Sequence, residues 1–129
     1  MSAVRNPGSD RTPLELEYAC WRAVIEGRAL EVYRHVMASD ARVFLPERYF
    51  HRREALAEWV TTLEWHQFRF TGERMLPITE SITLATYDAV ADQADSTVPL
   101  RCSSLYVWRE SRWQLTLHQR RPLAATTGG

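Results

Sequence analysis

The stretch LRCSSLYVWRESRWQLTLHQRRP at residues 100–122 contains two strand-like segments joined by a short polar turn. Residues 98–109 are rich in residues that suit a pleated, half-buried sheet, and residues 113–120 alternate between apolar and polar. This pattern predicts an antiparallel hairpin that ends at Pro122. Strict alternation puts Trp113, Leu115 and Leu117 on one face, and Gln114, Thr116, His118 and Arg120 on the other. We expect a ligand to prefer the polar face.

The residues before this hairpin predict helices first and strands later. Thr12, Pro13 and Glu15 form a helix start, with Thr12 as N-cap and Glu15 placed to close a capping box, and this helix should end near Gly27. Its periodicity predicts Leu14, Tyr18, Trp21 and Ile25 toward the core, and Glu15, Glu17, Arg22 and Glu26 toward water. The elements expected next are a helix at 28–38, a strand at 40–46, a loop to 52, a helix at 53–61, and strands at 63–75 and 82–92.

This order of elements predicts an α+β fold, with three helices on one side of an antiparallel sheet. A strongly curved sheet capped by helices forms a cone, and the cavity at its wide end is the expected binding site. A length of 129 residues with 45% hydrophobic content suits one core. We therefore predict a single domain at 12–123 between flexible tails at 1–11 and 124–129.

Composition excludes several classes of function. The 16 basic residues are all arginine and balance 16 acidic ones, so nothing in the overall charge favours nucleic acid or an anionic membrane. Without lysine, Schiff-base chemistry, a lysine base and a phosphate-binding loop of the Walker type are excluded. Cys20 and Cys102 fit no metal or redox spacing. No apolar run has the length of a membrane span, and MSAVRNPGSDRT lacks the apolar core of a signal peptide, so we expect a cytoplasmic protein.

The motif R-x-S-S-x-Y-V followed by R-W-x-L-x-x-H-Q, at the end of a chain that begins with two helices, resembles the nuclear transport factor 2-like superfamily. Within it, the resemblance is to the small bacterial branch of SnoaL-like polyketide cyclases and ketosteroid isomerases, and it covers residues 14–122. The resemblance implies a cone-shaped, curved antiparallel sheet packed against three N-terminal helices, as in cystatin-like folds. It implies no particular reaction, because one fold hosts many functions.

Some positions depart from the ketosteroid isomerase pattern. Trp21 stands where those enzymes carry a tyrosine that donates to the oxyanion, Leu45 replaces the base, and the second oxyanion acid falls near Leu105. Isomerisation by that route is therefore not expected. The pocket that the resemblance implies is aromatic with a few polar points. Its expected ligand-binding residues are Tyr18, Trp21, Ile25, Trp59, Trp65, Ser103, Leu105, Thr116 and Arg120.

His118 is the leading candidate for catalysis, because histidine titrates near neutral pH and this one lies on the polar strand face. The alternative is a histidine held by a hydrogen bond within the sheet or at a dimer surface. His66 is the second candidate, with a core or surface role as its alternative. Arg101, together with Tyr87 or Ser103, is the candidate for stabilising an oxyanion, although a solvated arginine at the rim fits the same position.

These residues support two hypotheses. The first is cofactor-free proton chemistry, namely isomerisation, cyclisation, dehydration or epoxide opening, on a hydrophobic oxygenated metabolite such as a polyketide or terpenoid. The second is a non-catalytic module for ligand binding or association. Either version is expected to form a homodimer through an apolar outer sheet face, built from Tyr106, Trp108, Trp113, Leu115 and Leu117. No metal, nucleotide or other cofactor is expected, because no cluster or glycine-rich loop supports one.

Overall fold

The computed structural model describes residues 11–123. The predicted tails therefore lie outside the described residues, except for Arg11. The helices are α1 (Pro13–Ile25), α2 (Ala29–Val36) and α3 (Arg52–Glu54), and α3 continues as a π-helical turn over Ala55–Trp59 and a 3-10 turn over Val60–Thr62. The strands are β1 (Met37–Leu45), β2 (Arg48–His51), β3 (Gln67–Thr79), β4 (Ile82–Asp92), β5 (Thr97–Arg109) and β6 (Arg112–Pro122).

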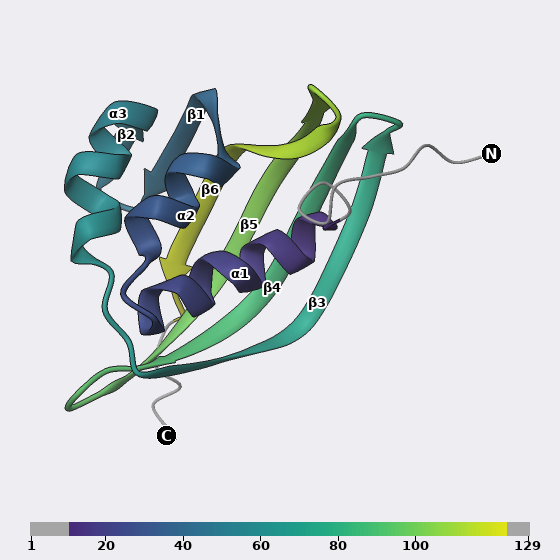
Figure 1. Ribbon diagram of the computed structural model, residues 1–129. Coiled ribbons are helices and arrows are strands. Elements are labelled where there is room, and N and C mark those ends of the chain that lie inside the picture. The colour runs from purple at the N-terminus through teal and green to yellow at the C-terminus, as the bar shows by residue number, and fades with distance from the viewer. Residues whose placement is uncertain (1–10, 124–129) are drawn as a thin grey trace.

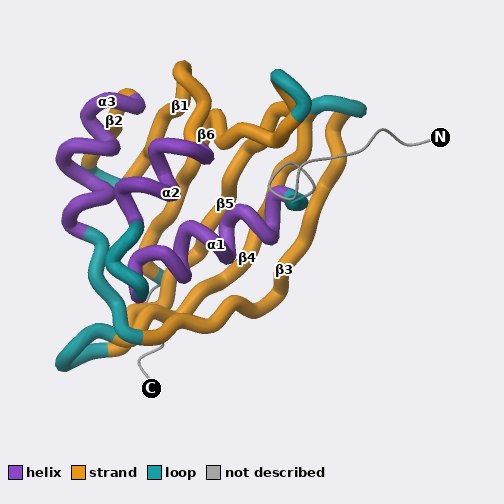
Figure 2. Tube along the Cα trace, viewed as in Figure 1, coloured by secondary structure: helices purple, strands orange, loops and turns teal. Residues whose placement is uncertain are grey.

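The strands form a six-stranded sheet in the order β2-β1-β6-β5-β4-β3, in which β1 and β6 run parallel and the other neighbours run antiparallel. The sheet is curved and open, and the helices gather on its concave side (Figure 1). Helix α1 contacts β3 and β4, whereas α2 contacts β1 and β6 (Figure 2). The predicted α+β class, with helices on one side of a curved sheet, is confirmed.

Helix α1 begins and ends as the sequence predicts. The Glu15 amide donates to the Thr12 hydroxyl at 3.2 Å, and the Thr12 amide donates to the Glu15 carboxylate at 2.8 Å, which completes the capping box. Gly27 has a φ of 72°, and the Arg28 amide donates to the Ala23 carbonyl at 2.8 Å. A residue in the left-handed region at this position, with that bond, is the Schellman ending of a helix.

Several element bounds differ from the prediction. The second helix ends at Val36 and β1 follows at once from Met37. The expected loop after Leu45 contains the short strand β2. Strand β3 begins at Gln67 and ends at Thr79. The buried side of α1 is also shifted from the expected one. Its buried residues are Pro13, Leu16, Glu17, Cys20, Trp21 and Ala23, whereas Tyr18 and Ile25 are exposed. The prediction that Glu17 faces water is therefore wrong.

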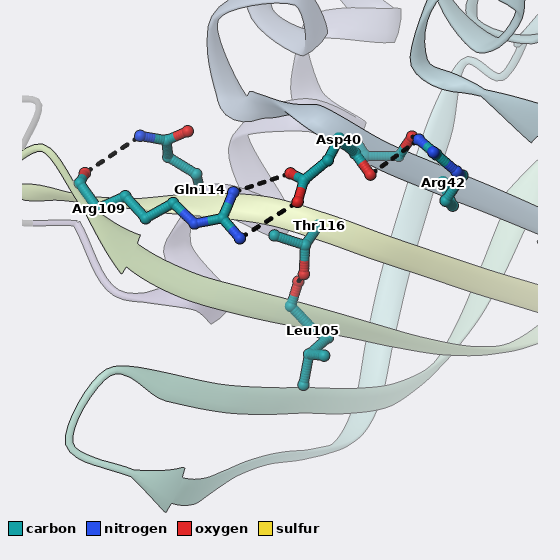
Figure 3. A network of polar contacts seen from close by, with 7 residues as sticks. Asp40, Arg42, Leu105, Arg109, Gln114 and Thr116 are labelled. Carbon is teal, nitrogen blue, oxygen red and sulfur yellow. Dashed lines mark hydrogen bonds and ion pairs between the residues drawn. The ribbon is translucent and has the colours of Figure 1, made fainter.

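A bulge in β6 changes which residues face the core. Leu105 pairs with Leu117, but the next residue, Tyr106, pairs with Leu115, so β6 holds one extra residue at Thr116. The Thr116 hydroxyl donates to the Leu105 carbonyl at 3.1 Å (Figure 3). Leu115 consequently lies on the same inner face as His118 and Arg120. The strict alternation predicted for this strand is wrong, and Tyr106 and Leu115 belong to the core rather than to an outer dimer surface.

The turn end of this hairpin is linked to β1 by an ion pair. The Arg109 guanidinium donates to both carboxylate oxygens of Asp40, at 2.8 and 3.2 Å (Figure 3). Both side chains are exposed, so the pair adds little to stability. It links β1 to the strand end beside the β5–β6 turn.

Candidate functional site

A buried carboxylate lies between α1 and the inner face of the sheet. Glu17 is only 2% exposed. Its Oε1 accepts hydrogen bonds from the hydroxyls of Tyr87 on β4 (2.5 Å) and Ser104 on β5 (2.6 Å). Its Oε2 accepts from the hydroxyl of Tyr106 on β5 (2.5 Å). Three hydroxyl donors match an ionised carboxylate, which can only accept.

The hydrogen-bond chain continues through His118, which is 2% exposed. Its Nδ1 lies 2.6 Å from the Ser104 hydroxyl, and its Nε2 lies 3.0 Å from Nε of Arg120. Because arginine can only donate, Nε2 must accept, and the ring proton must lie on Nδ1. The bonds therefore run in one direction, from Arg120 through His118 and Ser104 to Glu17. Burial, with the Arg120 charge second, lowers the pKa of His118 well below its usual range, so the ring is neutral.

Arg120 ends this chain inside an aromatic enclosure. Its guanidinium carbon lies 4.8 Å from the ring centroid of Trp21, 4.9 Å from that of Trp59 and 5.7 Å from that of Trp65. Arginine beside indole rings is a favourable cation–π arrangement. Within residues 11–123 its Nη2 atom is buried and has no hydrogen-bond partner. One donor of the chain is therefore unused.

Two tryptophans hold the other end of the chain. The Trp21 indole donates to the Tyr87 hydroxyl at 3.0 Å, and the Trp65 indole donates to the Trp21 carbonyl at 2.9 Å. The rings of Trp21 and Trp65 stack at 4.3 Å. Burial first, and then the Glu17 charge, raises the pKa of Tyr87 and of Tyr106 well above the usual value. Both phenols therefore stay protonated and remain donors.

The structure brings together part of the predicted site. His118, Tyr87 and Arg120 meet in the polar chain, and Trp21, Trp59 and Trp65 surround it. The inward orientation expected for these residues agrees with their burial. Whether they act on a ligand stays a prediction.

Other predicted site residues lie elsewhere. Arg101 and Ser103 alternate with the buried Cys102 and Ser104, so they and Leu105 lie on the outer face, where Arg101 donates to Asp88 at 2.9 Å. Their expected inward orientation is wrong, because β5 presents its even-numbered residues to the core. His66 is exposed just before β3, and Tyr18 and Ile25 are 50% and 38% exposed. Thr116 is the extra residue of the bulge, and its hydroxyl donates to the Leu105 carbonyl.

The sequence prediction missed Glu17, Ser104 and Tyr106. Glu17 precedes the buried Cys20 and Trp21 by three and four residues, which is the spacing of one helix face. That spacing is the available signal, but a glutamate normally marks the solvated side. Ser104 and Tyr106 stand within the quoted hairpin motif, and the alternation that assigned Ser103 inward excluded them.

One cavity, of about 340 Å³, includes Arg120 in its lining and lies where β1 ends beside β6. The other residues around it are Phe44, Leu45, Pro46, Gln119 and Arg121. Within residues 11–123, no group of three or more His, Cys, Asp or Glu side chains is arranged to hold a metal ion. Over the same part of the chain, no helix has the length and hydrophobicity needed to cross a membrane.

Comparison with known proteins identifies the fold of this chain. No family model matches the sequence, and no curated protein matches it. An NTF2-like protein of unknown function in nutrient uptake from Rhodospirillum rubrum is similar in structure, with a TM-score of 0.74 and 14% identity over 88% of this chain and 99% of that one. The chain has the nuclear transport factor 2-like fold. The resemblance stated from the hairpin motif is thus confirmed for the fold.

Two further solved structures are similar to this chain. A putative ketosteroid isomerase from Parabacteroides distasonis has a TM-score of 0.71 and 12% identity, over 92% of this chain and 94% of that one. A putative Ca/calmodulin-dependent kinase II association domain from Exiguobacterium sibiricum has a TM-score of 0.73 and 18% identity, over 96% and 100%. At such identities the likeness establishes architecture and leaves the reaction open.

Proposed function

We propose that the protein binds a hydrophobic, oxygenated small molecule, such as a polyketide or terpenoid, beneath its helices and performs cofactor-free acid/base chemistry on it. The observation that carries this proposal is the buried chain from Glu17 through Ser104 and His118 to Arg120. Burying a carboxylate and a guanidinium costs several kcal/mol, and apolar side chains would fill the same space more cheaply. A role in ligand chemistry would explain why the protein buries these two charged side chains despite the cost in folding free energy.

In this proposal Nε2 of His118 exchanges the proton with the ligand. Arg120 must first turn its Nε away, because that hydrogen bond occupies the lone pair of Nε2. Once protonated, the imidazole is stabilised by Glu17, whose Oε1 lies 3.6 Å from Nδ1 and is also linked to it by the Ser104 hydroxyl. Isomerisation, cyclisation, dehydration and epoxide opening each need one proton transfer of this kind.

The residues around the chain supply the remaining functions. Trp21, Trp59 and Trp65 surround the guanidinium and exclude water from the reacting region. Tyr87 keeps Glu17 in place by donating to it. His66 and Arg101, which the sequence favoured, are exposed and have no part in this mechanism.

The test begins with mass spectrometry of small molecules that stay bound during native purification. Turnover of the identified compound is then measured for the wild type and for His118→Asn. We expect His118→Asn to lower the rate by about 100-fold or more, the usual contribution of a general acid or base. His66→Asn, at the exposed histidine, is the matched control and should change nothing. An unchanged rate in His118→Asn rejects the proposal.

A non-catalytic ligand-binding or association module is the second candidate. It is favoured by the complete hydrogen bonding of the two central residues, since both nitrogens of His118 and both oxygens of Glu17 already have partners within the protein. The similarity to the structure of a putative Ca/calmodulin-dependent kinase II association domain is in keeping with it. Under this candidate the retained compound is recovered chemically unchanged after prolonged incubation with the protein.

A further inference from the structure

We infer that Arg120 anchors the ligand, and that its Nη2 donates a hydrogen bond to the carbonyl oxygen of an uncharged, planar metabolite. This inference rests on the proposed function, because it concerns the same interior site. It goes further by naming the group that is recognised and the class of molecule that carries it.

The first argument is the unused donor. Arg120 is 6% exposed, and its Nη2 makes no hydrogen bond within residues 11–123, whereas its Nε is hydrogen-bonded to His118. A buried N–H without an acceptor is unfavourable, and such groups are rare in folded proteins. An acceptor oxygen on a bound molecule removes that penalty.

The second argument is the shape and polarity around the guanidinium. Three indole rings lie within 4.8 to 5.7 Å of its central carbon, and two of them, Trp21 and Trp65, are stacked on each other. These flat apolar surfaces confine the guanidinium to the space between the rings, so the donor is already at the site before a ligand arrives. They also favour a flat, unsaturated body next to the ligand oxygen.

The third argument is charge balance, which selects a neutral oxygen over a carboxylate. The buried side chains with a formal charge in the described part of the chain are Glu17 and Arg120, one negative and one positive, and His118 between them is neutral. A ligand carboxylate would leave this site with an uncompensated buried negative charge, which is strongly unfavourable. A ketone, ester or amide oxygen accepts the same hydrogen bond without changing the balance.

The position of this donor also explains how a ligand reaches the proton-exchanging atom. The Nη2 and Nε atoms belong to one planar guanidinium, and Nε contacts Nε2 of His118 at 3.0 Å. A ligand oxygen bound to Nη2 therefore lies beside the imidazole. Movement of the guanidinium toward that oxygen loosens the bond that occupies Nε2.

The experiment compares three probes of one shape by ligand-observed NMR titration of the intact protein. They are acetonaphthone, isopropenylnaphthalene, in which a methylene group replaces the carbonyl oxygen, and naphthoate, which carries a negative charge. We expect acetonaphthone to bind at least about tenfold more tightly than either of the others, because a hydrogen bond from a charged donor is worth that much. Equal binding of the ketone and the alkene, tighter binding of naphthoate, or no binding of any probe would overturn the inference.

Variants supply a second measurement. Arg120→Met keeps the aliphatic stem and removes the donors, so the preference for the ketone over the alkene should disappear. Arg69→Met, at an exposed arginine on β3, is the matched control and should keep it. Because Arg120→Met removes a partner of His118 and can unfold the protein, the wild-type ratio decides alone if the variant does not fold. The outcome is separate from the proposed catalysis, since a ketone preference can hold while His118→Asn leaves turnover unchanged.

Discussion

At the scale of single residues, Glu17 determines how the interior is organised. Its carboxylate is the common acceptor for hydroxyls from two strands, and its charge balances that of Arg120. The sequence alone does not predict this role, because a glutamate on an amphipathic helix normally lies in water. The burial of Glu17 depends on Tyr87, Ser104 and Tyr106, which are 70 to 89 residues away in the chain. No local pattern contains that information.

Replacing Glu17 by glutamine tests this organisation. The amide group turns one acceptor into a donor, so a buried hydroxyl loses its partner and Arg120 loses its counter-charge. We expect a loss of about 3 kcal/mol in the free energy of unfolding, measured by urea denaturation. Glu58→Gln, which removes an exposed partner of Arg48, is the control and should lose less than about 1 kcal/mol. Equal losses in both variants would contradict the assigned role.

The buried imidazole of His118 predicts a pH dependence of stability. Burial lowers the pKa of His118 in the folded protein well below its value in the unfolded chain, so the unfolded state binds the proton more tightly. The stabilisation is complete above about pH 6.5 and is lost as the pH falls below it, by up to about 1.4 kcal/mol per pH unit. Urea denaturation between about pH 5.3 and 6.5, where the carboxylates of the unfolded chain are mostly ionised, measures this slope.

His118→Gln is the variant that isolates this effect. Without the imidazole, the free energy of unfolding should be nearly independent of pH over the same interval. His66→Gln, at an exposed histidine, should keep the wild-type slope. A flat wild-type profile would mean that the ring at position 118 is already charged or accessible in the folded protein.

At the scale of elements, the sequence predicts most helices and strands but not the faces they present. The caps of α1 follow from Thr12, Pro13 and Gly27, because capping depends on residues within a few positions. The inner face of β6 depends on the bulge at Thr116, and a bulge is defined by the pairing with β5 rather than by β6 itself. Regular alternation therefore predicts the strand correctly but places Thr116, instead of Leu115, on the same face as His118.

The bulge can be tested by removing its extra residue. Deleting Thr116 leaves Leu115 opposite Tyr106 and Leu117 opposite Leu105, so regular alternation alone then keeps Leu115, His118 and Arg120 on the inner face. We therefore expect the deletion variant to fold with a loss of less than about 3 kcal/mol in the free energy of unfolding, measured by circular dichroism and urea denaturation. Thr116→Val keeps the residue count, loses the bond to the Leu105 carbonyl, and should cost about 1 kcal/mol. A deletion variant that does not fold would contradict the pairing assigned on the two sides of Thr116.

At the scale of the whole molecule, the outer face of the sheet bears a row of leucines. Leu76, Leu84, Leu105 and Leu117 are direct cross-strand partners on β3, β4, β5 and β6. Leu76 is 46% exposed, and the other three are half-buried. Directly paired residues lie on one face of a sheet, so the row is a continuous apolar strip. It replaces the surface predicted from Tyr106 and Leu115 as the face on which we propose that two copies meet.

A charge placed in the middle of this strip tests the proposed homodimer. Leu105→Arg puts a guanidinium between Leu84 and Leu117, and pairing of two copies would bury it without a partner. We expect a wild-type dimer in sedimentation equilibrium and a monomer for Leu105→Arg, with unchanged circular dichroism because the side chain lies outside the core. Ala57→Arg, at an exposed position on the helical side, is the control and should stay dimeric. A self-complementary contact uses the same surface on both copies, so each dimer would carry the substitution twice and its effect on dimerisation would be doubled. A monomeric wild type, or a variant that still dimerises, contradicts pairing through this face.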